Sequence, residues 1–156
     1  MTTSKQHHNH AACVEKAMDA AEQVCRDNGV KLTDTRRKVL QMVWQGHSAV
    51  KAYDLIERFD GGKGATKPPT IYRALDFLVE NGLVHRIASL NAFVGCSHPA
   101  EGHEGNFFIC DDCNDVIEME GRPLSQPIEK MAKSKGFRVG HKTVEIHGTC
   151  GRCAAG

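Results

Sequence analysis

Two Cys-x-x-Cys pairs in the C-terminal half place the strongest constraint on how this chain can fold. Cys110 and Cys113 form the first pair, Cys150 and Cys153 form the second, and 36 residues separate the pairs. A two-residue spacer lets both sulfurs of a pair reach one ion, and two pairs supply the four thiolates that tetrahedral Zn²⁺ takes. Two disulfides or four free thiols are the alternatives, but no secretory signal precedes the cysteines, and cytosolic thiols stay reduced. The pairs therefore predict a structural zinc site.

A closed four-thiolate site has no open position for chemistry, so its expected role is to hold the fold together. Strand-like segments over 106–109 and 143–146 precede the two pairs, and a helix is expected over about 125–135. A metal joining the first strand to the chain end would stabilise a lobe that buries little apolar surface by itself. Residues 90–156 are therefore expected to form a small α+β metal-binding domain.

The composition is that of a soluble protein with one domain or two small ones in 156 residues. No apolar run approaches the roughly 18 residues of a membrane span, so we expect no membrane association. Residues 1–10 are polar and lack an apolar signal core. They are expected to form a disordered tail on a cytoplasmic protein.

Charge and hydrophobic periodicity indicate a different function for the N-terminal half. Residues 31–73 hold nine Lys and Arg against four acidic residues, whereas 90–156 hold seven against nine. A basic region of this kind suggests a polyanion as partner. The expected elements are helices over 12–28, from Thr33 or Asp34 to Gly46, over 52–59 and over 70–81, then strands over 83–87 and 92–95. Helices followed by a hairpin predict a winged-helix DNA-binding domain over residues 11–89.

At this point the chain resembles the ferric uptake regulator (Fur) family of bacterial metalloregulators, from about residue 14 to 153. The resemblance lies in Leu-Thr-Asp-Thr-Arg (32–36), Ala-Tyr (52–53), Pro-Thr-Ile-Tyr-Arg-Ala-Leu-Asp-Phe-Leu (69–78) and the two cysteine pairs. The Ala-Leu-Asp-Phe-Leu run, His85 with Cys96, and no His-x-His cluster before Cys110 favour its zinc uptake regulator (Zur) branch. Asp34 replaces the usual proline, and Lys51 stands where serine, a better cap for the third helix, is common.

The resemblance implies a homodimeric, zinc-dependent repressor whose dimerisation domain is the C-terminal lobe. It also implies a second, regulatory zinc in each subunit, held by His85, Cys96, His103 and Glu118. Two of these ligands come from the DNA-binding lobe and its hinge, and two from the other lobe, so zinc would fix the angle between lobes. A thiolate among the ligands favours Zn²⁺ over Mn²⁺ and Fe²⁺. His98 and Glu120 are the nearest substitutes for His103 and Glu118.

Two residues match family positions that contact DNA, and we expect both to reach base edges. Arg73 faces outward on the expected recognition helix and could donate two hydrogen bonds to guanine, while Tyr53 opens the preceding helix. The residues expected to contact phosphates are Thr70, Tyr72, Arg36, Lys51 and Lys67. Because a dimer presents two recognition helices, its double-stranded operator is expected to be an AT-rich imperfect palindrome. Arg37, Lys38 and Arg58 are interpreted as solvated helix charges.

The resemblance thus implies a zinc-responsive repressor of zinc uptake genes, which needs no small organic substrate. One alternative is a regulator of the same family that senses Fe²⁺, Mn²⁺, Ni²⁺ or peroxide. A zinc hydrolase using His85, His103 and Glu118 is a second alternative, but four protein ligands would close the metal shell and no spare general base stands nearby. A structural zinc-binding adaptor is a third, and it would leave the winged helix without a role.

Overall fold

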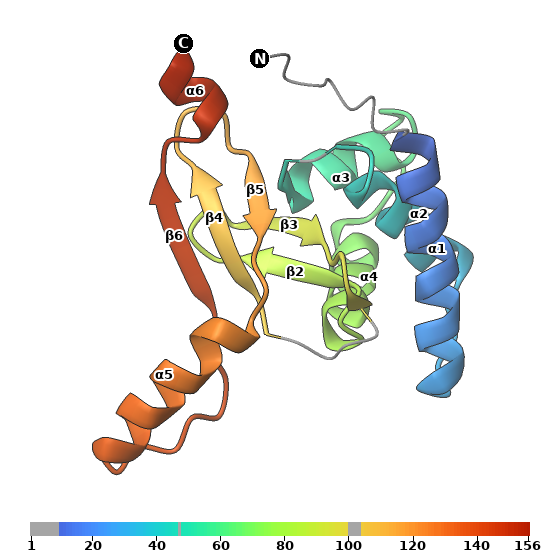
Figure 1. Cartoon of the computed structure of the whole chain (residues 1–156). Coiled ribbons are helices and arrows are strands. Elements are labelled where there is room, and N and C mark those ends of the chain that lie inside the picture. Colours follow the sequence, from blue (N-terminus) through green and yellow to red (C-terminus); the bar gives the residue numbers. More distant parts are fainter. Residues whose placement is uncertain (1–9, 47, 100–103) are drawn as a thin grey trace.

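The computed structural model describes residues 10–46, 48–99 and 104–156, and it consists of a helical part and a sheet-based part joined by a β-hairpin. The helices are α1 (His10–Asp27), α2 (Asp34–Val43), α3 (Ala52–Phe59), α4 (Pro68–Glu80), α5 (Arg122–Ser134) and α6 (Gly151–Ala155). The strands are β1 (Val50–Lys51), β2 (Val84–Ile87), β3 (Ala92–Gly95), β4 (Asn106–Cys110), β5 (Val116–Glu118) and β6 (Val144–Gly148). Figure 1 shows α1–α4 gathered on one side, the sheet of β4, β5 and β6 on the other, and β2 and β3 between them. The expected α+β class with a winged helix is confirmed.

Helix ends coincide with local capping signals. Thr33 caps α2, because its side chain accepts the Arg36 N–H at 3.4 Å, and Pro68 begins α4 with a fixed φ. Gly29 and Gly82 follow α1 and α4 with φ of 66° and 69°, a conformation that side chains with a Cβ disfavour. The helix α1 begins at His10, two residues before its expected start; residues 1–9 of the expected tail lie outside the described residues.

The core of the helical part lies between α2 and α4. The apolar spacing within the expected helix over 70–81 predicts a buried stripe of Ile71, Leu75, Leu78 and Val79. The first three are fully buried, but the prediction is wrong for Val79, which is 38% exposed. Val79 lies at the edge of the apolar stripe, and at the opposite edge Phe77 is buried beneath the Arg36 guanidinium, 3.6 Å from its ring centroid.

Two three-stranded sheets complete the fold. The wing sheet has the order β1-β3-β2, and its β1 is a two-residue strand that the sequence pattern did not predict. The second sheet has the order β5-β4-β6, in which β6 runs parallel to β4 and β5 antiparallel to it. The helices α5 and α6 extend from opposite ends of this sheet (Figure 1).

The two faces of the second sheet differ in character. On the inner face, Phe107 and Ile109 are buried against Ile87 of the wing. On the outer face, Phe108 pairs with both Ile117 and Ile146, so these three side chains form one apolar row, each more than 40% exposed. All the buried residues of 104–156 fall within 105–110. Among the described residues, no helix is long and apolar enough to cross a membrane.

Candidate metal centres and nucleic-acid interface

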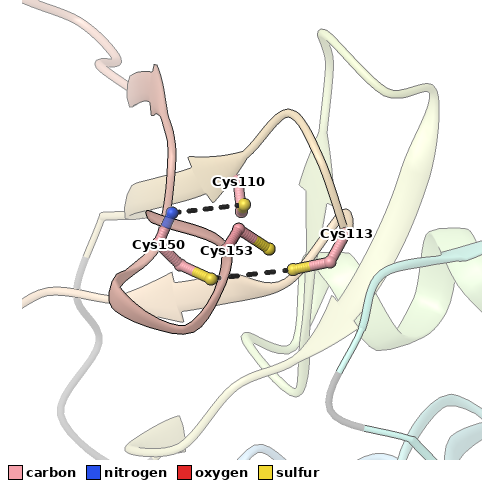
Figure 2. Close-up of side chains that lie close together, drawn as sticks. All are labelled: Cys110, Cys113, Cys150 and Cys153. Carbon is pink, nitrogen blue, oxygen red and sulfur yellow. Dashed lines mark hydrogen bonds between the residues drawn. The ribbon is translucent and has the colours of Figure 1, made fainter. Parts of the chain in front are cut away.

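The four cysteines of the two pairs lie together at one end of the second sheet. Cys110 ends β4 and Cys113 follows in a tight turn that needs the left-handed backbone of Asn114, at φ 58°. Cys150 caps α6 and Cys153 lies within it. Figure 2 shows the four sulfurs directed toward one another, and their separations are all within 4.8 Å.

This arrangement fits Zn²⁺. Two thiolates each about 2.3 Å from a tetrahedral zinc would lie about 3.8 Å apart, and the Cys113 and Cys150 sulfurs are 3.8 Å apart. The pKa of Cys110 is lowered to about 6, because the Cys150 and Cys113 N–H groups donate to its sulfur. The pKa of Cys153 is raised to about 12 by its hydrogen bonds to the Cys150 and Cys113 sulfurs. A shared cation would favour the thiolate form of all four.

A second cluster lies where the wing meets the sheet. His85 comes from β2, Cys96 follows β3, and Glu118 ends β5, although Cys96 and Glu118 are 22 positions apart in the sequence. His85 Nε2 is 3.0 Å from Glu118 Oε1, and the Cys96 sulfur is 3.9 Å from the same oxygen. Cys96 is 3% exposed, and the His85 and Glu118 side chains are 13% and 10% exposed. One imidazole, one thiol and one carboxylate thus meet in a nearly closed site.

The remaining residues expected as regulatory ligands are not part of this three-residue cluster. His103 lies outside the described residues. Its substitute His98 lines a cavity of about 610 Å³ that Glu118 and Glu120 also line. The carboxylate expected in the cluster is that of Glu118, which the Ser97 N–H also contacts at 3.1 Å from Oε2. Three donors in place leave one tetrahedral position for a fourth ligand, so the described residues fit Zn²⁺.

The expected DNA-contacting side chains are exposed on α3, on α4 and just before these helices. Tyr53 is 69% exposed in the first turn of α3, and Tyr72 is 48% exposed on α4. The further exposed residues of this set are Lys51, Lys67, Thr70 and Arg73. Arg36 differs from the expectation of a phosphate contact, because its guanidinium donates to the Lys31 carbonyl at 2.7 Å and covers Phe77.

Three basic residues interpreted as helix charges have partners within the chain. Arg37 pairs with Glu22 of α1 at 2.5 Å, and Lys38 lies 4.4 Å from the centre of the Phe59 ring. Arg58 donates to the Asp54 carbonyl at 3.2 Å. These contacts favour a structural role for all three.

Lys63, to which the sequence analysis assigned no role, lies exposed in the loop before α4. Asp60 accepts the N–H groups of Lys63 at 3.0 Å and Thr66 at 2.8 Å, so its carboxylate holds this loop in one shape. Burial raises the pKa of Asp60, but the N–H donors of Thr66, Ala65 and Lys63 outweigh it and lower the pKa. Lys63 and Lys67 are both exposed in the segment that leads into α4.

A helical bundle with a β-wing, followed by a sheet that carries two clusters of metal-binding side chains, defines a winged-helix transcription regulator. The ferric uptake regulator family matches residues 27–147. The zinc uptake regulation protein of Escherichia coli (strain K12) is 36% identical over 140 residues, which cover 89% of this chain and 82% of that protein. The chain belongs to the ferric uptake regulator family, whose members are transcription regulators and not enzymes.

Solved structures are similar over nearly the whole chain. A zinc uptake regulator complexed with zinc and DNA has a TM-score of 0.85 at 35% identity, covering 91% of this chain and 95% of that one. The holo form of XcZur has a TM-score of 0.81 at 43% identity, covering 89% of this chain and 97% of its own. The apo form of XcZur has a TM-score of only 0.53 at 42% identity, covering 92% and 99%. The present arrangement therefore resembles the holo form far more than the apo form.

Proposed function

We propose that this chain is a zinc-responsive transcriptional repressor that binds operator DNA as a homodimer and controls zinc uptake genes. The observation that carries the proposal is the cluster of His85, Cys96 and Glu118, which spans the wing and the second sheet. A ligand set drawn from both lobes makes zinc occupancy depend on the angle between them. The similarity to zinc uptake regulators supports the choice of metal.

Two zinc ions per subunit are proposed. The first is structural and is held by Cys110, Cys113, Cys150 and Cys153. The second is regulatory and is held by His85, Cys96, Glu118 and, as the proposed fourth ligand, His103. The buried thiol of Cys96 favours Zn²⁺ over harder cations, which carboxylates and water would satisfy better.

The proposed mechanism follows from which elements carry the ligands. Zinc bound there supplies a cross-link between lobes. His85 and Cys96 belong to the wing, and Glu118 belongs to the sheet, so their approach fixes the wing against Phe107, whose ring lies 5.3 Å from that of His85. The likeness to a holo form and to a DNA complex supports this arrangement as the DNA-competent one.

Homodimerisation is proposed through the C-terminal lobe, expected over residues 90–156, and the DNA-binding lobe over residues 11–89 is completed by the wing strand β3, which pairs with β1 and β2. The exposed apolar row of Phe108, Ile117 and Ile146 is the supporting observation, since a lone lobe gains by covering such a surface. Two further large apolar side chains of this lobe, Met131 and Phe137, are 66% and 68% exposed. A repressor of this kind would act on DNA in the cytoplasm.

In the proposed DNA complex, α4 enters the major groove of an AT-rich palindromic operator. Arg73 and Tyr53 reach base edges, while Thr70, Tyr72, Lys51 and Lys67 contact phosphates. The contacts of Arg36 with Lys31 and Phe77 reduce its proposed share in phosphate binding. Lys63 joins the phosphate set, because its loop lies next to the first turn of α4.

Replacing Arg73 by alanine should weaken operator binding by about 1–3 kcal/mol and relax the preference at one base pair, because a base-edge contact carries sequence information. Lys67→Ala is the matched control: it should weaken binding to all sequences alike and flatten the salt dependence. Binding to an operator and to its single-base variants at several salt concentrations measures both effects. If Arg73→Ala and Lys67→Ala lose equal affinity for scrambled DNA, the assignment of α4 as the recognition helix is refuted.

The proposed function is tested by DNA binding with each metal buffered in turn. AT-rich palindromic fragments should be bound with Zn²⁺ at far lower free metal than with Fe²⁺, Mn²⁺ or Ni²⁺, because the thiolate of Cys96 discriminates among these ions. Zinc counted per subunit in the same samples should be two. Tighter DNA binding with Fe²⁺ or Mn²⁺ than with Zn²⁺ would support the alternative sensor and overturn the proposal.

A further inference from the structure

Two glutamates flank the same residue in the central strand of the second sheet. Glu118 of β5 and Glu145 of β6 both pair with Phe107 of β4. Paired residues of neighbouring strands project from the same face of a sheet, and Phe107 is fully buried against Ile87 of the wing. Both carboxylates therefore face the wing, one on each side of its apolar contact with the sheet.

Glu145 contacts the turn of the wing, far along the hairpin from the regulatory cluster. Its Oε1 accepts the Ala88 N–H at 2.7 Å, and its Oε2 accepts the Ser89 N–H at 3.1 Å. Glu118 accepts the Ser97 N–H in the same way just beyond β3. A carboxylate from each edge strand thus holds one end of the hairpin, and hydrogen bonds to an ionised acceptor are the stronger kind.

A histidine on the same strand strengthens the contact at the turn. His147 lies two residues beyond Glu145, so it projects from the same face of β6. Its Nε2 is 3.0 Å from Ser89 Oγ, and its Nδ1 is 2.7 Å from Asp111 Oδ1. Burial raises the pKa of Glu145, but hydrogen bonds from Ser89 and Ala88 outweigh it and lower the pKa, which keeps the carboxylate ionised at neutral pH.

We propose that Glu145 is a positioning residue that latches the wing turn to β6 and so sets how much zinc the regulator needs. The inference rests on the proposed function. Glu145 is not one of the proposed zinc ligands, so the latch favours the present lobe arrangement whether or not zinc is bound. The latch and the zinc ion both favour the DNA-competent lobe arrangement, and their contributions add. Without the latch, fewer molecules are in this arrangement before zinc binds, so the apparent zinc affinity falls in proportion.

The test is a zinc-buffered DNA-binding titration of wild type, Glu145→Ala, Glu145→Gln and the control Glu15→Gln. For Glu145→Ala we expect the free zinc at half-maximal binding to rise about tenfold, as for loss of charge-assisted hydrogen bonds. DNA affinity at saturating zinc should stay within about twofold of wild type, because the metal alone then holds the competent arrangement. Glu145→Gln should shift less, since an amide oxygen still accepts one N–H group. Glu15 is exposed on α1 and belongs to neither cluster, so its variant should match wild type.

An unchanged zinc midpoint in folded, dimeric Glu145→Ala overturns the latch, and so does a loss of DNA affinity at saturating zinc without a shift of the midpoint. If the alanine variant does not fold, the midpoint of Glu145→Gln decides, and no shift there overturns the latch as well. Wild type that binds DNA equally with and without zinc would instead refute the proposed function on which the latch rests.

Discussion

Cys113→Ser should lose one zinc per subunit and, with it, both the folded C-terminal lobe and the dimer. The buried residues of 104–156 all lie within 105–110, so this lobe has a very small core of its own. Zinc sites with four protein ligands contribute about 10–16 kcal/mol of apparent binding energy to small domains, far more than such a core supplies. Cys113 is the informative position because it is exposed, whereas Cys110 is buried and its substitution would also disturb packing.

Zinc content by metal analysis and mass by light scattering check this expectation. Cys13→Ser is the matched control, since Cys13 is half-buried on α1 and belongs neither to the four-cysteine cluster nor to the cluster of His85, Cys96 and Glu118. That variant should retain both zinc ions and the dimer. A dimeric Cys113→Ser protein with two zinc ions would contradict the structural role of the four-cysteine cluster.

Cys96→Ser should give a folded dimer that keeps the structural zinc and no longer responds to zinc in DNA binding. The serine hydroxyl fits the space of the thiol but is a poor ligand for Zn²⁺, so only the cross-link between lobes is lost. A change from about 1% to 99% competent molecules corresponds to roughly 5.5 kcal/mol of differential affinity, or about 10⁴-fold. We expect Cys96→Ser to lose most of this roughly 10⁴-fold effect of zinc on DNA binding.

Cys25→Ser is the control for removing a buried thiol, because Cys25 is 2% exposed in the helical core and far in sequence from both clusters. It should lower the free energy of unfolding by about 1 kcal/mol or more through the buried hydroxyl, without changing the zinc response. Circular dichroism melting and zinc-buffered DNA binding separate these two outcomes. A Cys96→Ser protein with a normal zinc response would refute the regulatory cluster.

Much of this fold follows from local signals. The cap at Thr33, the proline start of α4 and the glycines after α1 and α4 act over a few residues, so the helix order could be predicted from them. The four-cysteine cluster could also be predicted, because two Cys-x-x-Cys pairs at that spacing favour one shared metal site. The grouping of His85, Cys96 and Glu118 came from the family resemblance, since no short-range pattern joins residues on three separate elements.

Contacts between distant segments could not be predicted in the same way. The parallel pairing of β4 and β6 places Glu145 opposite Phe107, and only this register brings its carboxylate to the wing turn. The brief strand β1 depends on pairing with β3, which no two-residue pattern encodes. The sequence predicts a phosphate contact for Arg36, but its position over Phe77 depends on how α2 packs against α4.

The most direct test of the account is a paired titration that measures zinc affinity at the regulatory site with and without operator DNA. Linkage requires that operator tighten zinc binding by the same factor by which zinc tightens operator binding. We expect wild type to show this reciprocal factor, and Cys96→Ser, with its structural zinc in place, to show none. An operator that leaves the wild-type zinc affinity unchanged, while zinc still alters operator affinity through another site, would contradict the claim that the His85, Cys96 and Glu118 cluster is the switch.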